Sequence, residues 1–472
     1  MASKKKTATK KDSMKHHSNE DFPVVGLGAS AGGLEALKVF FSNAPESSGM
    51  AFIVVVHMSP DKPSLMPELL QKQTEMPVEH AKDGQLVEPD HVYIMPSDKN
   101  LTLERGKIKL LEIPSKLPHL PIDTLFRSLA KDKGARGGGI VFSGTGSDGA
   151  LGLKEIKAHE GLVMVQSPDT AKYDSMPKNA LATGAVDIAL PPEKMPAVIV
   201  SCFEKPQDPS EAAPFQGNEE SSVWLGKLLS LLRTRMGHDF SAYKRNTLLR
   251  RVQRRIGLKL MDSPDEYLKL LRDEPEEVEF LFRDLLIGVT SFFRDPESYD
   301  VLQETVLPKY FSEIKDDEVF RIWVAGCSTG EEAYSLAILF RESLEKHSKR
   351  TTLQIFGTDI DKYAIDKARE GLYPGNIASD VSPERLRRHF IKEGDYFRIR
   401  KEIRDSIVFS VQDILKDPPF SRLNMLCCRN LLIYLDGGAQ KKLIPLFHYT
   451  LKPEGLLMLG SVSYTHLTLP TN

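Results

Sequence analysis

The sequence predicts an α/β fold built from two doubly wound, mainly parallel-sheet catalytic domains, with a small all-helical domain between them. Strand-like apolar runs alternate with helical stretches over residues 22–203, and the same alternation returns over 292–459. Between these stretches, 223–286 shows a helical pattern and no strand signal. Alternation of strands and helices is typical of a parallel sheet covered by helices.

Composition limits the possible classes of protein. A chain of 472 residues is long enough for about two to four domains. The net charge of −2 does not favour nucleic acid as a partner. Apolar runs are strand-sized, the longest being 51–56, far below the roughly 18–20 residues that span a bilayer. The four cysteines lack metal-ligand spacing. We therefore expect a cytoplasmic protein without membrane insertion, bound metal or disulfide bonds.

The domain boundaries follow from changes in composition along the chain. In the first domain, the predicted strands are 23–28, 51–56, 92–95, 139–142 and 162–165. In the second α/β domain they include 320–325 and 353–357. The predicted order is a disordered basic tail over 1–20, a first α/β domain over 21–204, a polar, proline-bearing linker over 205–222, a helical domain over 223–286, and a second α/β domain over 287–462. Residues 463–472 depart from the preceding pattern, and we expect a truncation or foreign sequence there.

Three candidate catalytic residues lie at or just after the ends of predicted strands in the first domain. Ser30 follows strand 23–28 in a glycine-rich turn, His57 follows 51–56, and Asp148 follows 139–142. Carboxyl ends of parallel strands share one edge, so the three can converge there. Ser30 would attack, His57 would take its proton, and Asp148 would orient the imidazole. Separately, each residue also suits a structural role, as a helix cap or a strand end.

Four segments of the first domain resemble the catalytic domain of CheB chemotaxis methylesterases. They are Gly-Ala-Ser-Ala-Gly-Gly (28–33), Val-Val-His-Met (55–58), Ile-Asp-Thr-Leu-Phe-Arg-Ser-Leu-Ala (122–130) and Gly-Thr-Gly-Ser-Asp-Gly-Ala (144–150). The resemblance implies that Ser30, His57 and Asp148 hydrolyse glutamyl methyl esters on receptor helices, releasing methanol; it also allows deamidation of glutamine. Ala31 and Thr145 stand where many relatives have Thr and Met.

A nucleoside-binding pattern opens the second α/β domain. The loop Gly-Cys-Ser-Thr-Gly-Glu-Glu (326–332) follows one strand, and Asp359 ends the next. An acidic residue at this place can accept hydrogen bonds from ribose hydroxyls. The pattern alone leaves NAD and S-adenosylmethionine open. The two loop glutamates would repel a pyrophosphate and suit a cation, which favours the sulfonium cofactor.

This domain and the helical segment before it resemble the CheR chemotaxis methyltransferases. The matching segments include Thr-Ser-Phe-Phe-Arg (290–294), Cys-Ser-Thr-Gly-Glu-Glu-Ala-Tyr-Ser (327–335), Gly-Thr-Asp-Ile-Asp (357–361) and Cys-Arg-Asn-Leu-Leu-Ile-Tyr-Leu (428–435). The resemblance implies S-adenosylmethionine as co-substrate. The cofactor contacts that it implies are Thr290, Arg294, Glu332 (or its neighbour Glu331), Asp359, Asp413, Ile414, Cys428 and Arg429.

The resemblance places Arg294 and Tyr434 nearest the transferred methyl group. A substrate glutamate is already ionised at neutral pH, since its reference pKa is about 4.3. It can attack the sulfonium methyl directly, so positioning should supply most of the rate. Arg294 could instead form an ion pair with Asp295 or Glu297, and Tyr434 could be a core residue. Gly288 stands where many relatives have Asn.

Two pairs of arginines share a face in the helical domain. Arg250 and Arg254, and likewise Arg251 and Arg255, are four residues apart. We predict that this face is exposed and docks an acidic, methyl-accepting receptor helix. Nucleic acid is less favoured because no aromatic stacking set accompanies the arginines. A solvated face paired with local acids is the remaining alternative.

Together the two halves predict a bifunctional adaptation enzyme that methylates receptor glutamates and hydrolyses the resulting esters. Alternatives are a signalling scaffold with inactive sites, or a small-molecule methyltransferase fused to an unrelated esterase. About 20 residues precede the first domain, so we expect no receiver domain there. Downstream signalling domains absent from this chain are a further expected partner.

Overall fold

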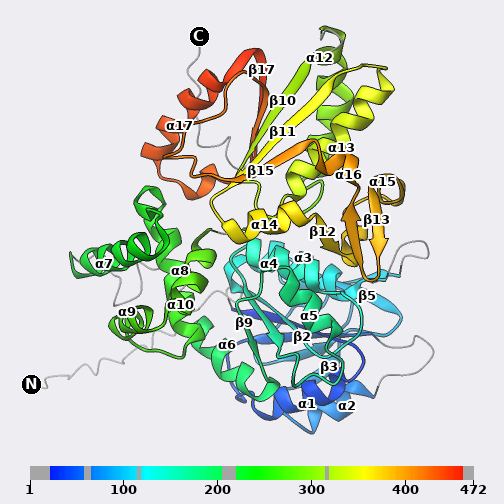
Figure 1. Cartoon of the computed structure of the whole chain (residues 1–472). Helices are drawn as coiled ribbons and strands as arrows, with labels where there is room; N and C mark the ends of the chain where they lie inside the picture. The colour runs from blue at the N-terminus through cyan, green and yellow to red at the C-terminus, as the bar shows by residue number, and fades with distance from the viewer. Residues whose placement is uncertain are drawn as a thin grey trace, which may run out of the picture.

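The computed structural model describes residues 22–57, 65–113, 119–204, 219–286, 288–313 and 318–460. We refer to 22–204 as the first α/β region, 219–286 as the helical region and 288–460 as the second α/β region (Figure 1). The predicted tails, 1–20 and 463–472, and most of the predicted linker lie outside the described residues.

A seven-stranded parallel sheet forms the centre of the first α/β region. Its strand order is β3-β4-β2-β1-β7-β8-β9. The strands β2, β4 and β3 lie on one side of β1, and the later strands β7, β8 and β9 lie on the other. The direction of strand order therefore reverses between β1 and β7. Ligand sites in open α/β sheets lie at the carboxyl ends of strands at such a reversal. The strands are β1 (Val24–Ala29), β2 (Ala51–Val56), β3 (Val78–His80), β4 (Val92–Ile94), β7 (Gly137–Val141), β8 (Leu162–Gln166) and β9 (Ile188–Leu190).

Helices cover both faces of this sheet, and the central strands are accordingly apolar on both sides. One core cluster joins the sheet to α1 (Gly33–Ser42), α2 (Met66–Gln71) and α6 (Met195–Glu204). The opposite cluster joins it to α3 (Pro121–Lys133), α4 (Ala150–Ala158) and α5 (Ser175–Ala182). Strands buried on both faces need continuous apolar runs rather than alternation, as in 51–56. An antiparallel hairpin of β5 (Lys99–Glu104) and β6 (Lys107–Glu112) also contributes to the second cluster.

The helical region has its own core of apolar side chains. It contains α7 (Glu219–Met236), α8 (Arg245–Leu258), α9 (Pro264–Asp273) and α10 (Pro275–Leu286). The predicted end of the linker at 222 is wrong, because α7 begins at Glu219. Acidic and serine residues are as common in the first turn of a helix as in a linker, so composition alone could not place this boundary.

The second α/β region contains a five-stranded parallel sheet of order β15-β11-β10-β16-β17. Its order reverses between β10 and β16. The strands are β10 (Val319–Ala325), β11 (Thr352–Asp359), β15 (Ile407–Val411), β16 (Leu423–Cys428) and β17 (Leu451–Leu459). The helices are α11 (Pro296–Val301), α12 (Leu307–Glu313), α13 (Glu331–Lys346), α14 (Lys362–Glu370), α15 (Pro383–His389), α16 (Lys401–Arg404) and α17 (Gly437–Thr450).

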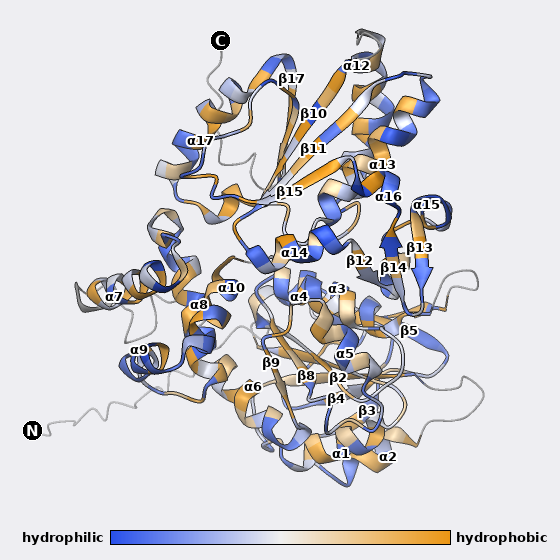
Figure 2. Ribbon diagram, viewed as in Figure 1, coloured by the Kyte–Doolittle hydropathy of each residue, from blue (hydrophilic) through white to orange (hydrophobic). Residues whose placement is uncertain are grey.

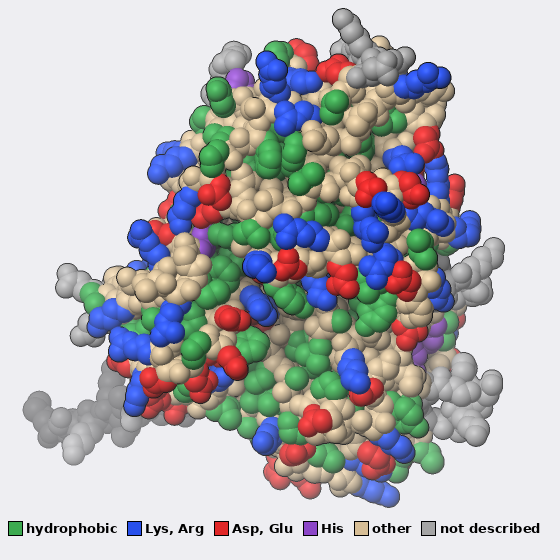
Figure 3. Space-filling model, in the orientation of Figure 1, with side chains coloured by type: hydrophobic (Ala, Val, Ile, Leu, Met, Phe, Trp, Pro, Cys, Tyr) green, Lys and Arg blue, Asp and Glu red, His purple; other side chains and the backbone are tan. Residues whose placement is uncertain are grey.

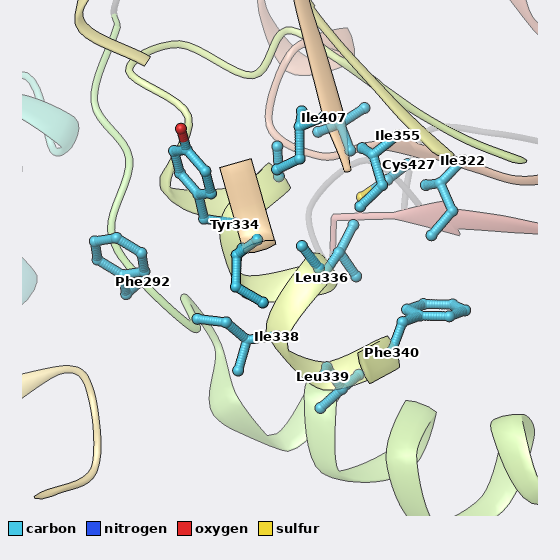
Figure 4. Close-up of a cluster of buried hydrophobic side chains, with 14 of the residues drawn as sticks. Phe292, Ile322, Tyr334, Leu336, Ile338, Leu339, Phe340, Ile355, Ile407 and Cys427 are labelled. Atoms are coloured by element: carbon cyan, nitrogen blue, oxygen red, sulfur yellow. The ribbon is translucent and has the colours of Figure 1, made fainter. Parts of the chain in front are cut away.

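Apolar side chains fill both faces of this second sheet. Figure 4 shows Leu336 and Phe340 of α13 beside Ile322 of β10 and Ile355 of β11. On the opposite face, Trp323 of β10 packs with α17. Figure 2 shows the corresponding hydrophobic colouring along the central strands of both sheets. A small antiparallel sheet of β12 (Leu372–Pro374), β14 (Tyr396–Ile399) and β13 (Phe390–Glu393) is inserted between β11 and β15.

The two α/β regions are in direct contact, although the helical region lies between them in sequence. In Figure 1, α3 and α4 of the first region lie next to α14 and β12 of the second. Ion pairs join them, including Arg127–Asp380 at 2.8 Å and Lys154–Glu331 at 2.9 Å. Charged side chains of both signs lie along the level where the regions meet (Figure 3). The predicted fold class is confirmed, with two parallel sheets and an all-helical part between them in the chain. No helix in the described ranges is long and apolar enough to cross a membrane.

Candidate functional sites

The register of the first sheet brings two of the predicted catalytic residues together. Ala29 of β1 pairs with Val56 of β2, so the residues that follow them, Ser30 and His57, leave adjacent strands at the same level. Neighbouring strands lie roughly 4.8 Å apart. Asp148 follows β7, the strand on the other side of β1. All three predicted residues therefore lie at one edge, where the strand order reverses.

His57 and Asp148 are joined by a hydrogen bond of 2.7 Å between Nε2 and an Asp148 carboxylate oxygen. The Asp148 carboxylate is buried and also accepts from the backbone N–H groups of Ile122 (3.0 Å) and Asp123 (2.9 Å). These donors belong to the first turn of α3, where helical N–H groups lack intrahelical partners and favour a negative charge. Asp148 thus holds the imidazole through Nε2, and Nδ1 is the ring nitrogen outside this hydrogen bond.

The turn after Ser30 needs glycine. Gly32 has φ 74°, and a Cβ there would lie 2.9 Å from Ser143 Oγ. Gly32 caps α1, whose first residue is Gly33. The Ser30 N–H donates to the Ser143 carbonyl at 3.1 Å, so the serine is held against the strand end of β7. Free N–H groups at the start of α1 are suitably placed to stabilise a developing oxyanion.

Two further titratable residues stand beside this site and were missed by sequence reasoning. Burial, and then the charge of Asp148, raises the pKa of Asp123 well above its usual value. The His119 ring centroid lies 5.9 Å from that of His57, and burial lowers the pKa of His119. Asp123 lies inside the matched segment 122–130 and could have been considered for its acidity. His119 had no distinguishing sequence pattern.

A pocket at the carboxyl edge of the second sheet contains most of the predicted cofactor residues. It encloses ≈ 1010 Å³ of space including its open mouth. Loops after β10, β11, β15 and β16 contribute, as does the helical region. The predicted residues in its wall are Thr290, Arg294, Glu332, Asp359, Asp413, Ile414, Arg429 and Tyr434.

Asp359 ends β11 and faces the glycine loop. Its carboxylate accepts from the Ser328 N–H at 2.8 Å and from the Asp361 N–H at 2.9 Å. Burial raises its pKa to about 6, against the lowering effect of these backbone donors. Ser328 adopts φ 47°, which turns its N–H toward the carboxylate. Each carboxylate oxygen can accept a further hydrogen bond, so Asp359 can still bind a ribose hydroxyl.

Two arginines of the pocket wall, Arg294 and Arg429, are held by specific partners. Arg294 donates to the Val289 carbonyl at 3.1 Å, and the Asn430 amide oxygen, in its favourable orientation, accepts from the Arg294 guanidinium at 3.0 Å. Asp295 pairs with Arg429 at 2.7 Å. The alternative interpretation of Arg294 as the ion-pair partner of Asp295 is therefore not what the structure shows. Arg429 also lies 3.6 Å from Glu332.

Two of the predicted cofactor contacts lie outside this pocket. Cys428, the last residue of β16, is fully buried in the core that includes α17, and the pocket wall begins at Arg429. Glu331 pairs with Lys154 and accepts from Thr329 Oγ1 at 2.6 Å, whereas Glu332 lines the pocket. The choice between the adjacent glutamates depended on helix orientation at the start of α13.

The pocket also contains residues that sequence reasoning did not identify. His238 of the helical region contacts Asp413 through Nδ1 at 3.1 Å, and its Nε2 is buried without a hydrogen-bond partner among the described residues. Ala158, the last residue of α4, comes from the first α/β region. Both belong to other parts of the chain, so no local pattern could assign them to this pocket.

These side chains fit the cationic nucleoside expected from the resemblance. Glu332, Asp359 and Asp413 supply acceptors for ammonium, ribose and base groups, while Arg294 and Arg429 suit a carboxylate. Within the described part of the chain, the unpartnered Nε2 of His238 marks a polar position in the wall where a ligand can complete the hydrogen bonding.

The predicted exposed arginine face is wrong. Arg251 and Arg255 are each 5% exposed, because α8 packs against the first α/β region and α10. Arg255 binds Glu277 at 2.6 Å, and Arg251 donates to the Asp284 carbonyl at 2.6 Å. Arg250 pairs with Glu160 at 3.0 Å, and Arg254 donates to the Gly161 carbonyl at 2.9 Å. These four arginine side chains of α8 therefore bind other parts of the same chain.

Comparison with known proteins gives three adjoining family matches. Residues 25–199 match the CheB methylesterase model, 225–286 match the all-alpha domain of CheR methyltransferase, and 288–465 match its SAM binding domain. The catalytic domain of Thermotoga maritima CheB methylesterase is a similar solved structure, with 28% identity and a TM-score of 0.36, covering 38% of this chain and 98% of that one.

Two curated relatives cover different shares of the chain. The chemotaxis protein methyltransferase of Salmonella typhimurium is 30% identical over 252 residues, which is 51% of this chain and 83% of that protein. An uncharacterized 104.1 kDa protein of Rhodobacter capsulatus, from the hypE 3' region, is 36% identical over 416 residues. That match includes 84% of this chain but spans only 44% of the relative. The chain thus belongs to the CheR chemotaxis methyltransferases, with a domain of the CheB methylesterase family joined ahead of the CheR part.

Proposed function

We propose that the chain is a bifunctional adaptation enzyme that methylates glutamates of chemotaxis-type receptor helices and hydrolyses the resulting methyl esters. The observation that carries the proposal is the presence of both sites in one chain. A serine, histidine and aspartate meet at one sheet edge, and a pocket with acidic and basic walls lies at the carboxyl edge of the second sheet. Boundaries of 21–204 and 287–462 for the catalytic units, and a cytoplasmic location, remain predictions.

For hydrolysis, Ser30 Oγ attacks the ester carbonyl while His57 Nδ1 takes the hydroxyl proton. The protonated His57 is stabilised by the Asp148 carboxylate, which also accepts from the backbone N–H of Ile122 in the first turn of α3. His57 then returns the proton to the departing methoxide, releasing methanol and leaving the glutamyl ester of Ser30. Water, activated by His57, cleaves this acyl-enzyme and restores the free glutamate and serine. N–H groups at the start of α1 stabilise both oxyanions.

For methyl transfer, the residues of the second site act by positioning. S-adenosylmethionine, when bound, supplies an electrophilic methyl group. Asp359 and Asp413 would hold its ribose and base, and Arg294 and Arg429 its carboxylate. Tyr434, at the same end as Arg294, borders the position where an acceptor carboxylate must arrive. The acceptor needs no general base because it is already ionised at neutral pH.

The proposal is tested by incubating the protein with methyl-labelled S-adenosylmethionine and receptor-bearing membranes, with protein ester and volatile methanol measured separately. Ser30→Ala should stop methanol release and let labelled ester accumulate. Asp359→Ala should weaken cofactor binding by about 1–3 kcal/mol, as expected for a lost charge-assisted hydrogen bond. Methanol release that persists in Ser30→Ala would refute the assigned nucleophile.

The alternative of a scaffold with inactive sites would leave label in neither fraction. The hydrogen-bonded His57–Asp148 pair and the pocket-facing Asp359 favour the enzyme. A purely structural role would not require a buried carboxylate at either place, because burial of such a charge is costly.

A further inference from the structure

One helix of the first α/β region reaches from the first site to the second. α4 begins at Ala150, two residues after Asp148, and ends at Ala158, which lies in the wall of the cofactor pocket. Its nine residues span about 13 Å. Midway along it, Lys154 pairs with Glu331, the first residue of α13 and the neighbour of the pocket residue Glu332.

The turn that follows α4 is clamped by two arginines of α8. Arg254 donates to the carbonyl groups of Glu160 and Gly161, and Arg250 pairs with the Glu160 carboxylate at 3.0 Å. The C-terminal end of a helix carries partial negative charge and favours cations. The arginines of α8 therefore bind a helix terminus that also bears a glutamate.

This turn adjoins the cofactor pocket, because Ala158, the residue before it, lines the pocket together with Arg294 and Tyr434. Burial raises the pKa of Tyr434, and the charges acting on it are Arg251, Arg294 and Glu160. Glu160, two residues after the pocket residue Ala158, therefore lies on the side of the pocket wall that contains Tyr434, one of the residues that border the transferred methyl in the proposed function. A carboxylate from the chain itself stands where the acceptor glutamate is expected to approach.

We infer that the α4–β8 turn (residues 159–161), held by Arg250 and Arg254, blocks the approach of a glutamate-bearing helix to the cofactor pocket in the closed chain. The inference rests on the proposed function for the identity of the acceptor. A helix with side chains is about 10–12 Å wide, so a receptor helix cannot share the mouth with this turn. Methyl transfer to a protein then requires the first α/β region to move away, while the small cofactor requires no such opening.

Buried ion pairs hold the closed arrangement. Lys157 of α4 contacts both Asp187 of its own region and Asp284 of α10, the latter at 2.8 Å. Arg255 lies 3.5 Å from Asp284 and donates to the Asp187 carbonyl at 3.4 Å. Asp284 therefore lies beside Lys157 of the first α/β region and Arg255 of its own region.

Asp284→Asn is the variant that weakens this contact most selectively, because Lys157 keeps Asp187 as a partner. Glu279→Gln is the matched control, since Glu279 lies on the same helix but is exposed and pairs with Arg283. Small-angle scattering should show a larger radius of gyration for Asp284→Asn than for the control. Amide exchange should rise in 158–161 and 431–435. Unchanged scattering and exchange would overturn the role of Asp284 as a lock.

Receptor methylation tests the occlusion itself. Asp284→Asn should raise kcat/KM for receptor about tenfold or more, because loss of a buried pair strongly shifts the closed state. Affinity for S-adenosylmethionine should stay equal to that of Glu279→Gln. An opened chain that methylates receptor no faster would refute the inference. A wild-type chain and variants that all bind cofactor but never methylate receptor would instead refute the proposed function.

The turn can be tested separately by charge exchange. Glu160→Arg should open the chain, and adding Arg250→Glu should restore the compact scattering profile, because the ion pair is rebuilt with its charges exchanged. A partly exposed pair of this kind should change the closed population by up to about fivefold. Glu193→Arg, at an exposed position in the short helix Pro192–Lys194 of the same region, is the control and should leave scattering unchanged. Failure of the exchanged pair to close the chain would refute the role of the turn in blocking the pocket.

Discussion

At the scale of single residues, the first site contains two adjacent acids with different surroundings. Asp148 accepts two backbone hydrogen bonds and the His57 ring, whereas Asp123 accepts one from Gly152 at 2.6 Å and keeps one oxygen unpartnered among the described residues. Burial and the neighbouring Asp148 raise the pKa of Asp123 well above its usual value. The backbone donors are therefore concentrated on Asp148, and Asp123 is the acid whose charged form is disfavoured.

This difference predicts unequal effects of two similar substitutions. Asp123→Asn should reduce ester hydrolysis only a few-fold, because burial already disfavours the charged form of Asp123 and an amide has the same shape. Asp148→Asn should lose roughly 10³–10⁴-fold in kcat, because an amide can hold the wrong imidazole tautomer. Methanol release from methylated receptor measures both. Equal losses would show that Asp123 carries the charge instead.

The raised pKa of Asp359 predicts that cofactor binding depends on pH. Its pKa is raised to about 6 by burial, so the ionised acceptor needed for ribose hydroxyls is depleted below that pH. S-adenosylmethionine should bind more weakly at pH 5 than at pH 7.5, and Asp359→Asn should remove most of this difference. Calorimetric titration at the two pH values measures the effect. A wild-type affinity independent of pH would contradict the assignment.

The same shift affects folding stability in the opposite sense. A carboxyl whose pKa is higher in the folded state binds its proton more tightly there than in the unfolded chain. Its contribution to the free energy of unfolding is therefore fully present below 3.8, and is lost as pH rises through about 6. Binding and stability thus favour opposite ionisation states of one residue at the cofactor site.

At the scale of elements, α6 and α8 cross at a glycine. A Cβ at Gly257 would lie 3.2 Å from Cys202 Cα and from the Ser201 carbonyl oxygen. The two helices belong to different regions, so this close approach brings the helical region onto the first α/β region. Close backbone approach at a helix crossing is a structural reason for glycine in a helix interior.

Gly257→Leu should therefore weaken the α6–α8 contact by about 1–3 kcal/mol, as expected for an added side chain without space. Gly226→Leu, on the exposed surface of α7, should be neutral or stabilising, because no described atom lies within 4 Å of the position that its Cβ would take. Thermal unfolding monitored by calorimetry compares the two. A Gly257→Leu variant as stable as Gly226→Leu would show that the helices adjust freely.

The helices and strands also show where the local sequence pattern was sufficient to predict an element and its bounds. Strand 51–56 has the predicted bounds, because a continuous apolar run that starts just after Gly49 and ends before His57 leaves few alternatives. The small sheet of β12, β13 and β14 was not predicted, since its strands are short and carry many charges. The start of α7 was placed too late because Glu and Ser favour both linkers and helix starts.

At the scale of the whole molecule, stability depends on charges buried beside the contact between the helical region and the first α/β region, where Arg255 also reaches the Asp187 carbonyl. Arg255 is bound by Glu277, which is itself nearly inaccessible and also pairs with Lys259 at 2.9 Å. Removing one member of a buried pair costs more than the pair contributes, because the other charge remains desolvated.

Arg255→Met should accordingly lower the free energy of unfolding of the helical region by about 3–5 kcal/mol. Arg283→Met, which removes an exposed i,i+4 pair with Glu279, should cost no more than about 0.5 kcal/mol. Urea unfolding followed by circular dichroism measures both differences. Similar midpoints for the two variants would mean that solvent or rearranged acids compensate the buried Glu277.

The sequence by itself determined the fold class, the order of the two α/β parts and the loops that bear Ser30, His57, Asp148 and Asp359. These features are local, because each depends on an apolar strand followed by a glycine turn or a polar residue. The tertiary structure alone decided which side of a helix faces which neighbour. It placed Glu332 in the pocket and Glu331 against Lys154, and it turned the arginines of α8 toward the α4–β8 turn. Such contacts join residues 90 or more positions apart, and their choice depends on how three separately formed cores pack together.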